Sequence, residues 1–197
     1  MNLELLVTSN DKKEDLRTKR TKKLLALSLL QLLQEKSLEN ISVADICKKS
    51  LLHRTSFYTH FEDKLELFEY IITIISGNIF NSALENKTFT SSMELYKYLI
   101  DISINIVDEN KKAFASMVSK NNDELVVSIF AGTIKKEIEK LLNKNNDNLK
   151  IPVNIIAGFY SSGFLATLIW WISTPNKYSK EQLINFLDII IDDKLKI

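Results

Sequence analysis

Apolar residues recur at intervals of three and four along most of the chain, which is the spacing of one face of an α-helix. Leu29 and Leu33 follow this spacing near the N-terminus, and Ile71 and Ile75 follow it further along. The pattern predicts about nine helices, at residues 17–36, 43–49, 53–60, 63–84, 91–108, 110–119, 122–144, 152–173 and 179–195. Only 4 glycines and 2 prolines occur in 197 residues, and this scarcity of turn formers favours long helices over tight hairpins. We therefore expect an all-α fold.

The second and third predicted helices are short and are joined by a turn of three or four residues. The first of them begins at a capping box, in which Ser42 and Asp45 satisfy each other's backbone amides. Two short helices backed by a longer amphipathic one are typical of a helix-turn-helix. We therefore divide the chain into a charged lead-in at residues 1–16, a helix-turn-helix domain at 17–62, and a larger helical bundle at 63–197.

Positive charge is concentrated in the same N-terminal part. Residues 12–64 contain 12 Lys and Arg against 7 Asp and Glu, whereas residues 65–197 contain 14 against 16. The whole chain has a formal net charge of only +1, and both histidines, His53 and His60, lie within the basic stretch. Such a local excess of positive charge indicates attraction to phosphate, although a solvated basic face would have the same composition.

In a helix-turn-helix the last helix enters the major groove, and its first residues contact base edges. The predicted helix at 53–60 carries polar side chains on its outer side, while Phe57 and Phe61 are expected to face inward as anchors. Arg54 can form a bidentate contact with guanine, and Thr55 can bond a base edge or touch a thymine methyl. We predict base contacts by His53, Arg54, Thr55 and Ser56, and phosphate contacts by Ser42, Tyr58, His60 and Lys64.

The order of these residues is itself informative. Ser42-Val43-x-Asp45-Ile46 is followed by Phe57-Tyr58-x-His60-Phe61-x-x-Lys64-x-x-Leu67. This run closely resembles the DNA-binding signature of the TetR/AcrR family of bacterial regulators, in which Phe-Tyr-x-His-Phe closes the recognition helix. The similarity covers about residues 17–67. The resemblance implies a cytoplasmic transcriptional regulator, by family default a repressor, which binds a palindromic double-stranded operator as a homodimer.

Several positions depart from the family pattern. Many members have glycine after the first helix, where this chain has Ser37, and their turn reads Ala-Gly-Val-Ser, where this chain has Ser50-Leu51-Leu52-His53. Leu51 lacks the easy access of glycine to left-handed backbone geometry, and His53 is a poor replacement for a serine cap. The altered turn keeps open a second function, that of a partner-dependent regulator or interaction protein with weak or lost DNA binding. Salt dependence separates the two, because affinity that comes from neutralising phosphates falls steeply with salt.

Residues 151–176 carry no charge, a run longer than the ~20 residues that a membrane span needs. The run contains Asn154, Ser161 and Thr167, however, which a lipid-facing helix would avoid. We therefore interpret it as a buried interface helix and expect no membrane association.

Small residues recur every four positions in this run, at Gly158, Ser162 and Ala166, so that a second helix could approach closely. In the family that the chain resembles, the last two helices usually form a four-helix bundle with those of a partner. We predict a dimer interface of Gly158, Ser162, Ala166, Trp170, Leu183, Phe186, Leu187 and Ile190. The alternative is that both helices only form the core of the monomer.

The segment from Phe159 to Trp171, with Pro175 and Tyr178-Ser179, is loosely similar to the C-terminal domain of one family subgroup. That subgroup includes regulators linked to dihydroxyacetone kinase genes, some of which respond to a protein partner. We therefore expect the chain to respond either to a small apolar ligand or to a protein effector.

Aromatic residues and methionines in the larger domain could line an apolar ligand pocket. The candidates are Phe80, Tyr96, Phe114, Met117, Phe130 and Trp171. The alternative is that these residues are ordinary core. In the family, a ligand there tilts the long helix that begins near Asp63 and changes the spacing of the two reading helices. Residues 63–197 are thus expected to be the ligand-sensing and dimerisation domain.

The sequence argues against an enzyme. Its two histidines and its one cysteine, Cys47, all lie in the predicted DNA-binding domain, which leaves no Cys-His or Ser-His-Asp set elsewhere. It has no glycine-rich phosphate loop and no Cys/His cluster with metal-ligand spacing, so we expect neither cofactor nor metal. A single cysteine suits the reducing cytoplasm, and the apolar window at residues 3–7 is too short for a signal-peptide core.

Overall fold

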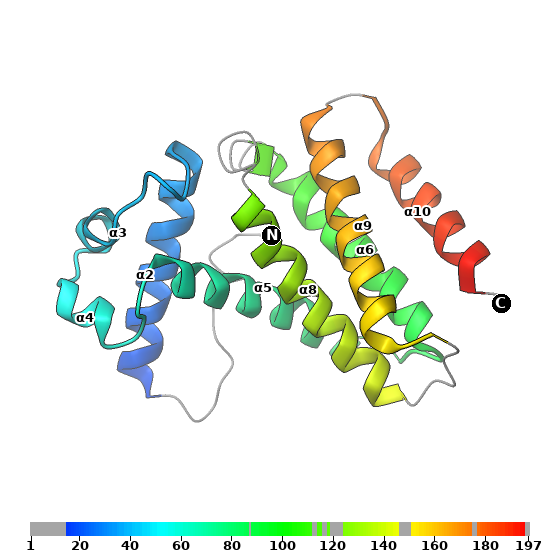
Figure 1. Cartoon of the computed structure of the whole chain (residues 1–197), viewed down its shortest axis with the longest axis horizontal. Coiled ribbons are helices and arrows are strands. Elements are labelled where there is room, and N and C mark those ends of the chain that lie inside the picture. Colours follow the sequence, from blue (N-terminus) through cyan, green and yellow to red (C-terminus); the bar gives the residue numbers. More distant parts are fainter. Residues whose placement is uncertain are drawn as a thin grey trace.

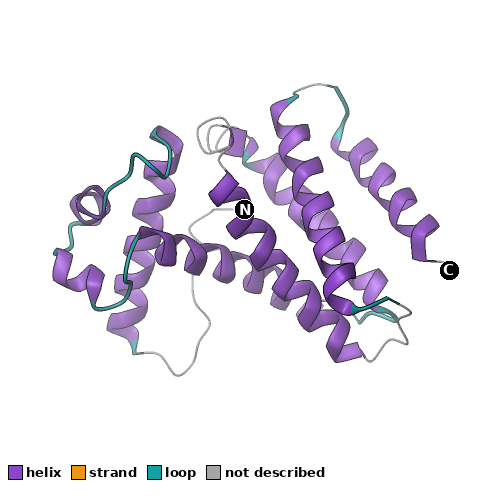
Figure 2. Cartoon of the chain, viewed as in Figure 1, coloured by secondary structure: helices purple, strands orange, loops and turns teal. Residues whose placement is uncertain are grey.

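The computed structural model describes residues 15–86, 88–111, 114, 115, 118, 124–145, 151–174 and 177–195. All regular structure in these residues is helical (Figure 2), which confirms the all-α prediction. The helices, labelled as in Figure 1, are α2 (Leu16–Glu35), α3 (Val43–Ser50), α4 (Arg54–Tyr58), α5 (Lys64–Asn86), α6 (Ser92–Glu109), α8 (Glu124–Asn145), α9 (Val153–Ser173) and α10 (Lys180–Leu195). The helix predicted at 110–119 lies partly outside the described residues, as do residues 1–14 of the lead-in.

Side-chain caps set where several of these helices begin. Asp15 accepts a hydrogen bond from the N–H of Arg17 at the start of α2, at 3.2 Å. Ser91 accepts from the N–H of Glu94 at 3.2 Å, and the Ser179 hydroxyl accepts from the N–H of Gln182 at the same distance. Because such caps depend on residues only two or three positions apart, they could be predicted from the sequence.

The helices form two groups that α5 connects. In Figure 1, α2, α3 and α4 gather at one end, and α5 runs from them into a bundle of α6, α8, α9 and α10. One apolar core contains Leu29 of α2, Ile46 of α3, Phe57 of α4 and Phe68 of α5, and it also includes Val126 of α8. The N-terminal group is therefore packed directly against the bundle, so movement of α5 or α8 would reach it.

A second core lies within the bundle, between α6, α8, α9 and α10. Trp171 of α9 is only 1% exposed there, and its indole N–H donates to the carbonyl oxygen of Tyr178 at 3.0 Å. In the described part of the chain, α9 is the one helix that is long and apolar enough to cross a membrane. Since α9 packs against its neighbours along one side, we assign it as a core helix with one open face, as its polar residues indicated.

Three residues have roles other than those predicted. Trp171 belongs to the bundle core, where Lys111 lies 4.3 Å from its ring centroid, and it does not line the cavity described below. Leu183 and Leu187, predicted at the dimer interface, are buried in the same core. The physical reason is that α10 has apolar residues on two sides, and only packing decides which side meets the bundle.

Candidate nucleic-acid interface

A capping box sets the start of α3, and two ion pairs join α3 to the end of α2. The Ser42 hydroxyl accepts from the N–H of Asp45 at 3.2 Å, and the Asp45 carboxylate accepts from the N–H of Ser42 at 2.9 Å. The same carboxylate lies 2.9 Å from the ammonium of Lys36, while Lys49 of α3 lies 2.7 Å from Glu35 of α2. Hydrogen bonds from Ser42 and Lys36 hold the pKa of Asp45 well below its usual range. The contact between α2 and α3 therefore stays ionised at neutral pH.

The turn between α3 and α4 contains a left-handed residue that is not glycine. Leu51 has φ 57° and ψ 33°, and its side chain is 91% exposed. The N–H of Leu52 bonds to the carbonyl oxygen of Cys47 at 3.0 Å, and that of Leu51 bonds to Lys48 at 3.4 Å. These bonds close α3 in the way that glycine usually allows, so the turn keeps its shape at the expense of backbone strain.

Two aromatic side chains anchor α4 to the core. Phe57 is fully buried and Phe61 nearly so, with their ring centroids 5.9 Å apart. Phe61 also lies 5.2 Å from the ring of Tyr70 on α5. The inward orientation predicted for Phe57 and Phe61 is confirmed, and the opposite side of α4 is therefore turned to solvent.

Most of the polar residues in and around α4 are exposed. His53, Arg54 and Thr55 are exposed, and the side chain of Tyr58 is 57% exposed. Ser56 and His60 are half-buried. No side chain caps the helix at His53, as its poor capping ability indicated. The structure thus exposes Arg54 and Thr55 on one short helix with His53 at its N-cap, whereas Ser56 is half-buried.

Lys64, predicted to contact a phosphate, has a different role in the structure. Its ammonium donates to three backbone carbonyl oxygens, those of Leu38, Glu39 and Ile41, each at 2.8 Å. An ammonium has three N–H donors, so these bonds use all of them. Lys64 therefore ties the start of α5 to the loop that precedes α3, and this structural role replaces the predicted phosphate contact.

The Ser42 hydroxyl is likewise engaged within the protein. It donates its hydrogen to the Asp45 carboxylate at 2.8 Å and accepts from the Asp45 N–H. A phosphate oxygen needs a donor, and the one hydrogen of this hydroxyl is already used in the capping box. The predicted phosphate contact through this hydroxyl is therefore corrected to a capping role.

Exposed cations that are not among the predicted contacts lie near α4. Lys48 lies in the last turn of α3, and Arg17 and Arg20 lie in the first turns of α2. The ammonium of Lys22, a turn further along α2, is 6.0 Å from the ring centroid of Phe61, so α2 begins close to the end of α4. Their signal in the sequence is basic charge on the side of each helix opposite its apolar face.

The larger domain encloses a cavity of about 220 Å³ between α5, α6, α8 and α9. Of the predicted pocket residues, Tyr96, Phe114 and Phe130 line it, whereas Met117 and the side chain of Phe80 lie outside the described residues. Leu33 of α2 and Phe68 and Ile72 of α5 also line it. The cavity therefore touches both the first helix of the N-terminal group and the helix that leaves this group.

One face of α9 and α10 exposes large apolar side chains. They are Ile155, Phe159 and Trp170 of α9 and Phe186, Ile189 and Ile190 of α10. Ser162, Gly163 and Ala166 are exposed between Phe159 and Trp170. Gly158, by contrast, is turned toward α8, where an added Cβ would lie 3.9 Å from the side chain of Lys135.

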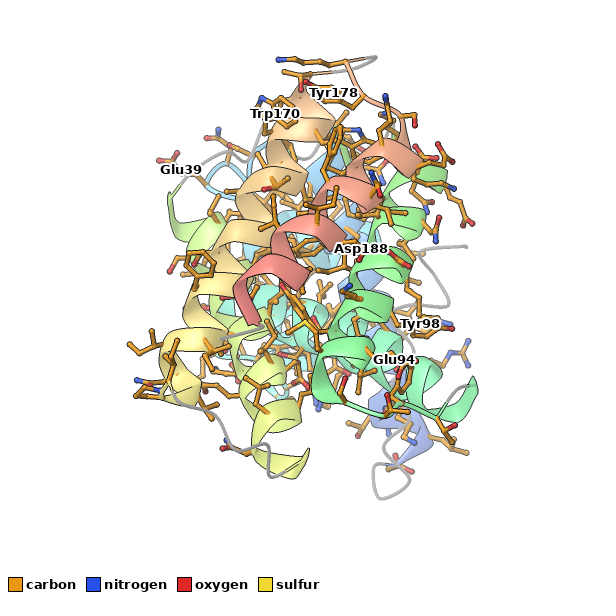
Figure 3. All side chains as sticks on the ribbon, turned by 90° about the vertical axis from the view of Figure 1, so that its right-hand side faces the viewer. Glu39, Glu94, Tyr98, Trp170, Tyr178 and Asp188 are labelled. Atoms are coloured by element: carbon orange, nitrogen blue, oxygen red, sulfur yellow. The ribbon has the colours of Figure 1, made fainter. Side chains whose placement is uncertain are left out.

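Aromatic rings gather at one end of this face. Figure 3, which looks onto α9 and α10, shows Trp170 and Tyr178 together where α9 ends, while Asp188 points from α10 toward α6. The ring centroids of Trp170 and Tyr178 are 6.0 Å apart, and those of Tyr178 and Phe186 are 5.4 Å apart. Trp170 and Phe186 thus belong to one continuous apolar surface, joined by the ring of Tyr178.

A capped helix, α3, is followed by a short turn and then by α4, whose polar residues are exposed and whose aromatic neighbours are buried. This arrangement is that of helix-turn-helix DNA-binding regulators. Family profiles agree with this class. The profile described as "Bacterial regulatory proteins, tetR family" matches residues 29–71, and the one described as "Transcriptional regulator C-terminal region" matches residues 93–193. The chain belongs to the TetR family of transcriptional regulators, which bind DNA and are not enzymes. No protein of curated function matches the sequence.

Solved structures share the fold at low sequence identity. A protein from Syntrophomonas wolfei described as a TetR-family transcriptional regulator superposes with a TM-score of 0.67 and 17% identity, covering 88% of this chain and 94% of that one. The dihydroxyacetone kinase operon activator DhaS has a TM-score of 0.55 and 19% identity, covering 89% and 96%. The fatty acid degradation regulator FadR from Bacillus halodurans has a TM-score of 0.59 and 13% identity, covering 91% and 96%. At these identities the likeness concerns the fold alone.

Proposed function

We propose that this chain is a bacterial, cytoplasmic transcriptional repressor. It binds a palindromic operator as a homodimer and is controlled by an effector. In this proposal residues 17–62 form the DNA-binding domain and residues 63–197 form the ligand-sensing and dimerisation domain. The observation that carries it is the geometry of α4, which turns Arg54 and Thr55 to solvent above the buried ring of Phe57. A rigid polar helix of this kind fits the major groove.

In and around α4, from His53 to His60, we assign two kinds of DNA contact. His53, Arg54, Thr55 and Ser56 read base edges, with Arg54 bonding to a guanine through both of its terminal nitrogens. Tyr58 and His60 contact phosphates, which set the position of the helix but carry no sequence information. The exposed cations Lys48, Arg17 and Arg20 add sequence-independent attraction to the phosphate backbone.

The test is selection of bound fragments from sheared source DNA by wild-type protein, Arg54→Ala, Tyr58→Ala and the control Lys140→Ala. Lys140 is 67% exposed on α8, so the control removes a cation far from α4. Loss of the bidentate contact of Arg54 should cost about 1–3 kcal/mol in operator binding. We expect a two-fold-symmetric, salt-sensitive site that the control retains and both α4 variants bind more weakly. A folded wild-type protein that enriches no sequence would favour the partner-dependent alternative.

The dimer proposal rests on the exposed face of α9 and α10. A single recognition helix reads only a few base pairs, so a symmetric operator needs two copies. Phe159 is 56% exposed and Ile189 is 53% exposed, and contiguous apolar surface of this kind marks interaction sites. The exposed Ser162, Gly163 and Ala166 let a second helix approach closely between the larger side chains.

Sedimentation of Phe159→Asp and Ile189→Asp tests this interface. Both variants should shift the protein toward monomer and reduce operator affinity, while circular dichroism stays that of the wild type. Leu16→Asp is the matched control for the sedimentation measurement alone, because Leu16 is 82% exposed in the first turn of α2, far from α9 and α10, but lies beside the cations near α4. If the charged variants remain dimeric, the interface lies on another face.

The direction of regulation is tested with a reporter gene placed behind the selected operator. Repression predicts higher expression when the regulator is deleted. The chain is similar in structure to DhaS, which is described as an operon activator. Lower expression on deletion would therefore indicate that this regulator is an activator as well.

Control of DNA binding by an effector is supported by the residues that line the cavity, because some of them also belong to the core that supports α4. Leu33 belongs both to the core that supports α4 and to the cavity wall. Phe68, in the first half of α5, likewise belongs both to this core and to the cavity wall. A molecule that fills the cavity contacts these side chains, and we propose that it shifts them and thereby changes the spacing of the two α4 helices in the dimer. Equal operator affinity for free and effector-saturated protein would contradict this part of the proposal.

A further inference from the structure

The size of the cavity limits what it can hold. Its volume is about 220 Å³, whereas an engineered apolar cavity of roughly 150 Å³ accommodates benzene. A ligand of about eight to twelve non-hydrogen atoms would therefore fill it. The lining is dominated by aliphatic and aromatic side chains such as Ile72, Ile100, Phe130 and Leu168, so most of that ligand must be hydrocarbon.

The polar groups of the lining offer mainly acceptors. Among the described residues they belong to Ser76, Tyr96, Ser103 and Glu137. The Tyr96 hydroxyl donates to the carbonyl oxygen of Tyr160 at 3.2 Å, and the Ser103 hydroxyl donates to that of Leu99 at 2.7 Å. Since both hydrogens are used within the protein, these two oxygens can only accept a hydrogen bond from a ligand.

Glu137 supplies the only charge among the described lining residues. Its side chain is 18% exposed, and one carboxylate oxygen lies 2.7 Å from the ammonium of Lys140, which is itself 67% exposed. The carboxylate is therefore largely shielded from water and is shared with an ammonium that lies mostly in water, so a donor within the cavity competes with a solvated partner for it. The described lining contains no Lys, Arg or His that could neutralise an anion.

We propose that the effector is a neutral or cationic amphiphile of medium length, whose hydrogen-bond-donating end lies at Glu137, and that anionic analogues are excluded. This inference rests on the proposed control of the regulator through its cavity. Burying a carboxylate against a described lining that holds no cation is costly, and the Glu137 carboxylate, whose charge Lys140 offsets in part, adds repulsion between like charges. An alcohol or an ammonium meets acceptors instead, so the end group of the ligand decides binding.

The experiment uses three probes of equal chain length, octan-1-ol, octylamine and octanoate, with the full-length protein at neutral pH. Binding is measured by calorimetry for the wild type, Glu137→Gln and Glu139→Gln. Glu139 lies on the same helix, pairs with Lys135 and does not line the cavity, so it is a control with the same charge change. We expect octanol and octylamine to bind at least about ten-fold more tightly than octanoate. Glu137→Gln should remove most of the preference for octylamine over octanoate, and Glu139→Gln should keep it.

Three results would overturn the proposal. Octanoate could bind as tightly as the other probes, the two glutamine variants could behave alike, or none of the probes could bind. Operator binding by the same ligand-free preparations is measured in parallel. Loss of the predicted probe preference with intact operator binding rejects the effector class alone, whereas absent operator binding rejects the proposed function.

Discussion

Replacing Leu51 by glycine should stabilise this protein. Leu51 has φ 57°, the one positive φ among the described non-glycine residues. In this region the Cβ of an L-residue crowds the backbone. With the side chain 91% exposed, almost no burial is lost when it is removed.

The expected gain is the strain relieved minus the added chain entropy. An L-residue in left-handed geometry costs roughly 1–2 kcal/mol. Glycine loses more freedom on folding than other residues, which costs about 0.5–1 kcal/mol. The net gain in the free energy of unfolding is therefore about 0–1.5 kcal/mol, with a midpoint near 0.75 kcal/mol that corresponds to roughly 1.5–3 °C in the melting temperature of a chain of this size.

Urea-induced unfolding followed by far-UV circular dichroism measures this gain. All variants are compared at one protein concentration, because the midpoint of a dimer depends on concentration. Leu51→Ala keeps the Cβ and hence the strain, so it should unfold within about 0.5 kcal/mol of the wild type.

Ser37→Gly is the second control. Ser37 is the other position where the family often has glycine, but its φ is not positive, and its hydroxyl accepts from the side chain of Asn40 at 2.8 Å. Glycine there should destabilise by about 0.5–1.5 kcal/mol. If Leu51→Gly unfolds at the same urea concentration as Leu51→Ala, relief of strain is refuted as the reason for any gain.

Three further predictions test the roles assigned above. Lys64→Met should lower the free energy of unfolding by about 1.5–3 kcal/mol, because three carbonyl oxygens lose a charged donor; a loss of operator affinity with unchanged urea stability would instead indicate a phosphate contact. The Asp45 carboxylate, whose pKa is lowered by hydrogen bonds from Ser42 and Lys36, adds stability that is present above the unfolded pKa of about 4 and is lost as pH falls toward the folded value. Wild-type unfolding midpoints should therefore fall more between pH 7 and about pH 3 than those of Asp45→Asn, and parallel pH curves would exclude this. Leu187→Ala should cost about 2–5 kcal/mol in unfolding, whereas Ile190→Ala should mainly weaken dimerisation in sedimentation, and the reverse pattern would exchange their assignments.

Much of the fold could be predicted because its signals are local. The capping box of Ser42 and Asp45 spans three positions, and the helix bounds follow from apolar spacing within single segments. Phe57 and Phe61 were identifiable as anchors because they are large apolar residues four positions apart in an otherwise largely polar segment. The same short-range information, compared with a known signature, was enough to identify the helix-turn-helix and the TetR family.

The candidate site was less completely predictable where roles depend on distant residues. Lys64 had the charge and the position of a phosphate ligand, but its partners, among them Leu38 and Ile41, precede it by more than twenty positions. Trp171 is a large aromatic residue of the kind that lines ligand pockets. In the fold, however, its indole N–H donates to the carbonyl oxygen of Tyr178 and its ring packs in the bundle core.

The sequence alone therefore determined the helices, the DNA-reading unit and the family, because caps, periodicity and motifs act over a few residues. Only the tertiary structure decided which side of each amphipathic helix meets a neighbour. Leu187 and Ile190 illustrate the difference, since both are apolar and one turn apart on α10, yet one is buried in the bundle and the other is exposed. Periodicity shows that a helix has an apolar face, but the packing of distant segments decides whether each residue of that face lies in the core, in the cavity or on the surface left for a partner.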